Sequence, residues 1–239
     1  MPPVATVARR ELLILFGQPV AWLALAGFVS LIGLLTLWKD DVLAGGVASM
    51  RGPFWWIASC LLLLAPAIAM RSIAEERRSG SLHLLATLPL TAVEIVVGKW
   101  AAAVVTLAVG LACTVPLAVA LFALGPVDPG PVVGGYVGLL GLASALAAVG
   151  VAASAATESQ VLAFLMALGV SAGPVVVGAA LPLVAPEWVS TVAVLTFQFH
   201  VEHLARGVVD LRSMAFFLAV SLVGLRVAVL QIEHRRLAR

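Results

Sequence analysis

Residues 73–99 read IAEERRSGSLHLLATLPLTAVEIVVGK, and this charged, leucine-containing stretch interrupts a chain that is otherwise strongly apolar. Hydrophobic residues make up 62% of the 239 residues and charged residues only 11%, with a mean hydropathy of +1.13. A soluble domain carries about 25% charged residues, so this chain cannot cover its surface with polar groups. The apolar segments on either side of residues 73–99 are therefore predicted to lie in a lipid bilayer.

Six segments are apolar and approach or exceed the length of about 20 residues that a helix needs to cross the hydrocarbon core. They are residues 20–38, 54–70, 95–124, 132–153, 160–184 and 214–230. The third segment is so long that part of it is expected to tilt or to extend beyond the bilayer. The sequence therefore predicts one all-α transmembrane domain over residues 1–239, a polytopic integral membrane protein with six transmembrane helices.

Basic residues are distributed unequally between the two sides that these six spans define. One side, with the helix ends that border it, has Arg9, Arg10, Arg71, Arg77, Arg78, Lys99, Arg226, Arg235, Arg236 and Arg239. The opposite side has Lys39, Arg51, Arg206 and Arg212. Because Lys and Arg concentrate on the cytoplasmic side of membrane proteins, both termini are predicted to be cytoplasmic. Residues 71–94 are then a cytoplasmic loop.

The charges at the start of this loop exclude it from the hydrocarbon core. Five charged residues lie between Arg71 and Arg78. At about 2.5–3.5 kcal/mol each at the bilayer centre, burying all five in lipid would cost more than roughly 12 kcal/mol. The loop must therefore reach water.

The order of residues within 71–94 predicts a helix, a break, a short apolar piece, a turn and a second, capped helix. Gly80, between two serines, breaks the helix that extends from the second span. Pro89 ends the apolar piece. Thr91 and Glu94 have the spacing of a capping box, which starts the helix of the third span. The apolar piece contains Leu82, Leu84, Leu85 and Leu88. Exposed leucines need an apolar surface to pack against. From the residues alone, the lipid headgroup region and a protein partner are equally possible as that surface.

Residues 185–213, between the fifth and sixth spans, are amphiphilic. They are too apolar for a solvated loop and too charged to cross a membrane. This pattern predicts re-entrant or interfacial short helices on the outer side. His200 and His203 lie three residues apart without the HExxH pattern, so they are interpreted as interfacial polar residues and no metal site is predicted.

The sequence contains no motif that predicts catalysis. Gly98 and Lys99 lack the upstream glycine of a phosphate-binding loop, so the chain is not predicted to be an enzyme or to bind a cofactor of its own. The predicted spans carry almost no ionisable residues, which argues against an ion-coupled carrier. A net charge of only +2 gives no reason to expect a nucleic-acid partner.

The stretch MRSIAEERRSGSLHLLATLPLTAVEIVVGKW, residues 70–100, resembles the segment that follows the second span of ABC-2-type transporter permeases. There a run such as A-E-E-R-x-S-G-T-L-E-L-L is followed by a P-x-S/T turn and a helix that opens with E-x-x-x-G-K. The matching residues are Glu75, Glu76, Arg77, Ser79, Gly80, Leu82, Leu84, Leu85, Pro89, Thr91, Glu94, Gly98 and Lys99. Ser81 and His83 depart from the commoner Thr and Glu.

A second stretch supports the resemblance. Residues 199–218, FHVEHLARGVVDLRSMAFFL, resemble the segment that leads into the last span of the gliding-motility-type permeases. The permeases of nitrous-oxide-reductase maturation are near relatives of that subgroup. The resemblance thus involves both halves of the chain.

The resemblance implies a function and a set of partners. The chain would be the permease subunit of an ABC transporter, an exporter in the bacterial cytoplasmic (inner) membrane, surrounded by membrane lipid. It would pair with a second copy of itself or a homologous permease, and with a separate ABC ATPase subunit that binds ATP and Mg. The alternative is a membrane scaffold for assembly or maturation that uses an associated ATPase without transporting anything.

The same resemblance implies that residues 71–94 couple the permease to the ATPase subunit. The residues implied in this coupling are Glu75, Glu76, Arg77, Arg78, Gly80, Leu82, Leu84, Leu85, Pro89, Thr91 and Glu94.

Overall fold

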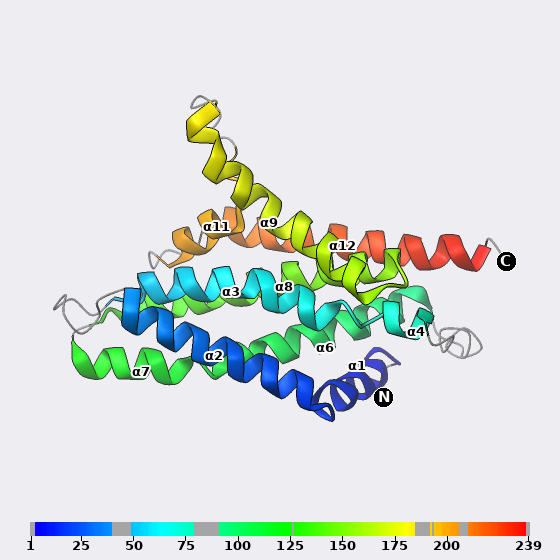
Figure 1. Ribbon diagram of the computed structural model, residues 1–239, viewed down its shortest axis with the longest axis horizontal. Helices are drawn as coiled ribbons and strands as arrows, with labels where there is room; N and C mark the ends of the chain where they lie inside the picture. Colours follow the sequence, from blue (N-terminus) through cyan, green and yellow to red (C-terminus); the bar gives the residue numbers. More distant parts are fainter. Residues whose placement is uncertain are drawn as a thin grey trace.

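The computed structural model describes residues 3–39, 49–78, 91–125, 127–184, 192, 194–205 and 210–237 (Figure 1). Within these ranges every regular element is a helix, as the all-α prediction requires. The helices are α1 (Pro3–Phe16), α2 (Pro19–Lys39), α3 (Arg51–Ala69), α4 (Ala74–Arg78), α6 (Ala92–Ala112), α7 (Val115–Leu124), α8 (Pro129–Ala156), α9 (Gln160–Val184), α11 (Phe197–Leu204) and α12 (Leu211–Leu237).

In the part of the chain that the structure describes, six helical stretches are long and apolar enough to cross a membrane. They are Pro19–Trp38, Arg51–Arg78, Ala92–Leu124, Pro129–Ala156, Gln160–Ala180 and Leu211–His234. Each overlaps one predicted span, so the prediction of a polytopic protein with six transmembrane helices is confirmed. Both termini and α4 lie at the same end of the bundle (Figure 1), as an even number of crossings requires.

The third span is divided, although residues 95–124 read as one segment in the sequence. α6 ends at Ala112 and α7 begins at Val115. Pro116 has no N–H to donate to the carbonyl of Ala112, and its ring crowds that carbonyl, so the helix cannot run on without interruption. Thr114 Oγ1 donates a hydrogen bond of 2.7 Å to Leu111 O and satisfies one of the carbonyls freed by the break.

The second span is also interrupted, just before its charged end. The prediction that residues 74–78 are helical is confirmed by α4, but a turn at residues 70–73 separates α4 from α3. The hydroxyl of Ser154 in α8 accepts hydrogen bonds from Ile73 N (3.0 Å) and Ala74 N (2.9 Å) and donates one to Met70 O (2.9 Å). One side chain thus satisfies the backbone groups that the turn leaves without helical partners.

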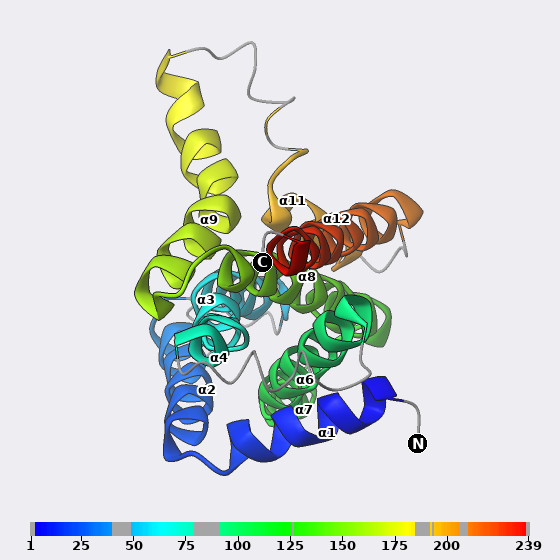
Figure 2. The ribbon, with the colours of Figure 1, turned by 90° about the vertical axis from the view of Figure 1, so that its right-hand side faces the viewer.

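α8 lies at the centre of the bundle. It packs against α3, α6, α9, α11 and α12, and Figure 2 shows it between α3, α6 and α12. Small residues make this packing close. A Cβ atom on Gly135 would lie 2.2 Å from Phe54 Cε2, and one on Gly224 would lie 2.9 Å from the backbone of Ala148. Larger side chains at these positions would force α3 and α12 away from α8.

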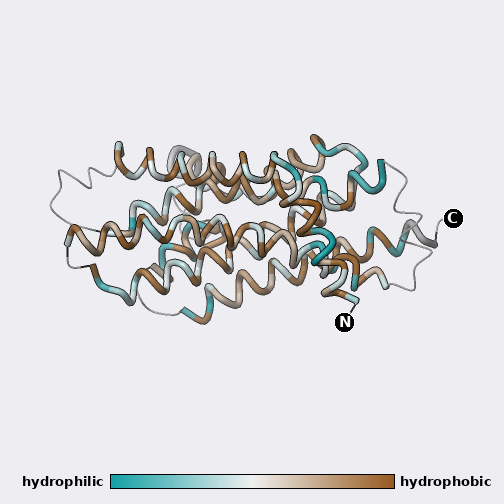
Figure 3. Tube along the Cα trace, turned by 90° about the horizontal axis from the view of Figure 1, so that it is seen from below, coloured by the Kyte–Doolittle hydropathy of each residue, from teal (hydrophilic) through white to brown (hydrophobic). Residues whose placement is uncertain are grey.

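The outside of the bundle is apolar. Leu23 is 71% exposed and Leu218 is 63% exposed, although a soluble protein would bury such side chains. In Figure 3 the hydrophobic colouring runs along the lengths of the helices, and strongly hydrophilic positions lie toward the two ends of the bundle. The bundle therefore presents to its surroundings the surface that a bilayer solvates.

Of the segment predicted to be re-entrant or interfacial, the structure describes residues 192, 194–205 and 210–213. They include one short helix, α11, which packs against α3, α8 and α12. The remaining residues of 185–213 lie outside the described part of the chain.

Candidate functional site

The residues predicted to couple the chain to an ATPase divide into two groups. Glu75, Glu76, Arg77 and Arg78 are on α4, and Thr91 and Glu94 are at the start of α6. The other five lie outside the described residues: Gly80, Leu82, Leu84, Leu85 and Pro89. The site is therefore described through the two helices that flank residues 79–90.

The start of α6 has the capping box that the sequence predicts. Thr91 Oγ1 accepts a hydrogen bond from Glu94 N (3.2 Å), and Glu94 Oε2 accepts one from Thr91 N (2.8 Å). Both N–H groups would otherwise lack partners at the helix end, so the box fixes where α6 begins. Glu94 also places a negative charge at the positive end of the helix dipole.

Arg77 attaches α4 to the end of α8. Its side chain is only 8% exposed; Nη1 donates a hydrogen bond of 2.7 Å to Ala155 O, and Nη2 lies 3.4 Å from Glu158 Oε1. A guanidinium that donates to a carbonyl in the last turn of a helix satisfies an otherwise unpaired acceptor. The ion pair between Arg77 and Glu158 adds little to stability, because Glu158 is 70% exposed and solvent screens its charge.

Lys99 joins three separate segments. Its Nζ lies 3.0 Å from Glu76 Oε1 on α4, 3.1 Å from Glu11 Oε2 on α1 and 2.6 Å from Ser72 O in the turn. The side chain of Lys99 is 1% exposed, and those of Glu11 and Glu76 are each 14% exposed. An ammonium group has three N–H donors, so all three are used. Together these contacts pair the positive charge of Lys99, which would be costly to bury away from water without a partner.

The sequence analysis did not predict this role of Lys99. It considered the residue as a cation on the cytoplasmic side, as part of an incomplete phosphate-binding loop and as part of the E-x-x-x-G-K match. A signal was present. Lys99 stands in an apolar segment, where an ionisable residue needs a partner. The sequence does not reveal which carboxylates pair with Lys99, because Glu11 is 88 residues away along the chain.

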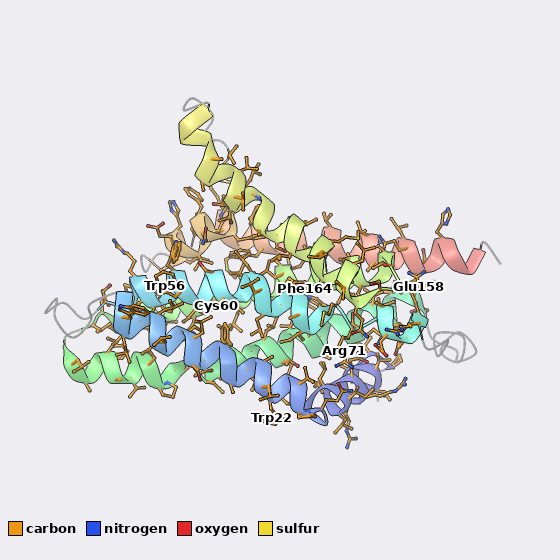
Figure 4. The ribbon with its side chains drawn as sticks, in the orientation of Figure 1. Trp22, Trp56, Cys60, Arg71, Glu158 and Phe164 are labelled. Carbon is orange, nitrogen blue, oxygen red and sulfur yellow. The ribbon has the colours of Figure 1, made fainter. Side chains whose placement is uncertain are left out.

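A small cavity, lined by both charged and apolar side chains, lies beside this cluster. Its volume is about 210 Å³, and α1, α3, α4 and α6 all contribute to its wall. Arg71 Nη1 donates a hydrogen bond of 2.8 Å to Gln18 Oε1 across it. Figure 4 places Arg71 and Glu158 at the end of the bundle that carries α4, and Trp56 toward the opposite end. Charged side chains from α1, α4 and α6 thus meet where the predicted coupling loop leaves the bundle.

In the part of the chain that the structure describes, no three metal-ligating side chains gather in one place, at the histidines or elsewhere. His200 Nε2 donates to Val194 O (2.8 Å), and Nδ1 lies 3.0 Å from Ser213 Oγ. Burial lowers the pKa of His200 below its usual value, which favours the neutral ring. His200 therefore joins α11 to the start of α12.

Comparison with known proteins gives the family. Residues 44–215, more than half of the chain, match the model of the ABC-2 family transporter proteins. No curated protein sequence gave a significant match. The finer resemblance to gliding-motility-type permeases therefore stays a prediction. The family match, together with the six apolar helices, shows that this chain belongs to the ABC-2 transporter family and is a multi-pass permease subunit of an ABC transporter.

Proposed function

We propose that this permease couples ATP hydrolysis on a separate ABC ATPase subunit to the outward movement of a substrate across the bacterial cytoplasmic membrane. The observation that supports this most is the attachment of both ends of residues 79–90. α4 is bound to α8 through Ser154 and Arg77, and Lys99 links α4 to α6. A displacement applied to the loop would therefore reach two transmembrane helices and the centre of the bundle.

Three of the four charged residues of α4 have distinguishable roles in this proposal. Glu76 and Arg77 contact their own chain, so they hold α4 in place. Arg78 is exposed and makes no ion pair among the described residues, so it is left to orient the ATPase subunit. An exposed pair contributes at most about 1 kcal/mol, so the leucines of residues 79–90 supply most of the affinity.

The working unit in this proposal contains two permeases, either two copies of this chain or one with a homologous partner, and two ATPases with ATP and Mg bound to them. The described spans offer few polar groups to a substrate. This favours a lipid-like or hydrophobic cargo, or a path along the seam between the two permeases.

The proposal requires residues 71–94 to face the cytoplasm. A single cysteine at Ser79, in a chain with Cys60→Ala and Cys113→Ala, is expected to resist a membrane-impermeant maleimide in intact cells and to react after the membrane is opened. This labelling pattern is expected because the excess of Lys and Arg at the end of the bundle that carries residues 71–94 predicts that this end is cytoplasmic. A cysteine introduced at Arg51 is the matched control with the opposite expected pattern. Ready labelling at Ser79 from outside intact cells would reverse the topology.

Reconstitution tests the function itself. The purified chain alone is expected to hydrolyse no ATP, because it has no phosphate-binding loop. In vesicles that also contain the ATPase subunit, ATP is expected to drive a fluorescent phospholipid analogue between leaflets, measured by dithionite quenching. ATP hydrolysis by the complex without any cargo movement, with lipid analogues and hydrophobic dyes alike, would favour the maturation scaffold over the transporter.

A further inference from the structure

α1 packs directly on α6, and Gly98 makes this contact possible. A Cβ atom at Gly98 would lie 2.7 Å from Val7 Cγ1 and 3.2 Å from Val4 O, both on α1. Real Cβ atoms do not approach a carbon atom so closely, so any other residue would push α1 outward. Gly98 thus sets the distance between the two helices.

Lys99, the next residue, adds a polar link at the same place. Its ammonium group lies 3.1 Å from Glu11 of α1 and 3.0 Å from Glu76 of α4. The three side chains are shielded from water, which strengthens their attraction and makes separation costly. α1, α4 and α6 therefore meet at one buried cation.

The far end of α1 is joined to the first span. Trp22 Nε1 on α2 donates a hydrogen bond of 2.9 Å to Phe16 O, the last residue of α1. The rings of Phe16 and Trp22 also contact each other, with centroids 5.4 Å apart. Side chains thus fix the bend between α1 and α2, and a shift of α1 would displace the start of α2.

We propose that Glu11, Gly98 and Lys99 are positioning residues that make α1 move with α4 and α6, so that α1 carries the displacement caused by the ATPase to α2. The inference rests on the proposed coupling function and extends it to a helix outside residues 71–94. It gives each member of the Gly98-Lys99 pair a specific role, since glycine provides the contact and lysine prevents α1 from separating. Figure 2 shows α1 lying across the end of the bundle, below α4 and α6 and joined to α2.

The test follows α1 in the complete complex of permease and ATPase subunit. Spin labels are placed on cysteines at Thr6 of α1 and Leu230 of α12, both exposed, in the Cys60→Ala/Cys113→Ala background. α12 packs on α8 and serves as the reference. Double electron–electron resonance then gives the distance between the labels without nucleotide and after trapping with ADP and vanadate. In the unaltered chain the distance is expected to shift between the two states.

Two variants disconnect α1 by different routes. Glu11→Leu removes one carboxylate but leaves Glu76 and Ser72 O as partners of Lys99, and Gly98→Ala forces α1 off α6 without touching a charge. Each is expected to reduce the nucleotide-dependent shift at least twofold and to lower kcat for ATP in the complex, with KM for ATP unchanged. Glu11→Asp, which keeps the carboxylate, is expected to restore part of the shift. Arg9→Leu is the matched control, since Arg9 is on the same helix, exposed and without an ion pair among the described residues.

The outcomes separate the inference from the function on which it rests. A full shift in both Glu11→Leu and Gly98→Ala would overturn the inference, even if both variants melted at lower temperature. So would the absence of any shift in the unaltered complex, or an equal loss in Arg9→Leu. Failure of the unaltered chain to bind the ATPase would overturn the proposed function, and the inference with it.

Discussion

Replacing Leu84 and Leu85 together by aspartate is expected to release the ATPase subunit from the permease. Each leucine contributes about 1.5–3 kcal/mol if it is fully buried against the partner, so losing both weakens binding by more than about 100-fold. Burying the new carboxylates would cost more still. Membrane insertion is expected to be unchanged, because the substitutions alter neither the span that ends at Arg78 nor the span that begins at Ala92. Co-purification of the ATPase subunit with a tagged permease measures the effect.

Ser79→Asp/Ser81→Asp is the matched control for this experiment. It adds the same two negative charges to the same segment and removes no leucine, so the ATPase subunit is expected to stay bound. Equal loss in both variants would assign the effect to charge rather than to apolar contact. If the Leu84→Asp/Leu85→Asp protein retains its ATPase at the unaltered level, the loop is not the docking element, and the leucines are covered by lipid headgroups instead.

Replacing Lys99 by methionine is expected to cause the largest loss of stability of any single substitution considered. Methionine fills similar space but leaves Glu11 and Glu76 shielded from water without their cation. Breaking a buried ion pair in this way costs about 3–5 kcal/mol. For a chain of this length that corresponds to a fall of roughly 10 °C in the midpoint of thermal unfolding. The midpoint is measured on the purified protein in detergent.

Two further variants test whether the loss comes from the unpaired carboxylates. Arg9→Met removes a cation from an exposed position on α1, outside the six spans, and is expected to change the free energy of unfolding by less than about 0.5 kcal/mol. Adding Glu11→Gln and Glu76→Gln to Lys99→Met removes the uncompensated charges and is expected to recover much of the stability. No recovery in this triple variant would mean that packing around the lysine stem, rather than charge, gives Lys99 its effect.

The sequence predicted those features of the molecule that depend on neighbouring residues or on the bilayer. The six spans could be found because lipid requires long apolar helices that satisfy their own backbone hydrogen bonds. The capping box of Thr91 and Glu94 could be found because both residues lie within one helical turn. Pro116 is a local signal for the break in the third span, but the prediction of one continuous segment over residues 95–124 did not use it.

The links between distant segments could not be predicted in the same way. Ser154 bonds to the turn at residues 70–73, and Arg77 bonds to Ala155, across about 80 residues of chain. Each of these residues also reads as an ordinary helix-end or small residue. Only the folded structure brings Ser154 and Ala155 of α8 against residues 70–77, and this contact holds α4 in place.

Sequence alone thus determined that this is a six-span, all-helical membrane protein with a charged loop between its second and third spans. Hydropathy and helix capping act over one helix at a time, so they can be read from a linear pattern. Tertiary structure alone decided that Lys99 is the residue at which α1, α4 and α6 meet. A buried ammonium group must find acceptors, but its chemistry does not say which of the carboxylates along the chain will supply them; the packing of the helices makes that choice.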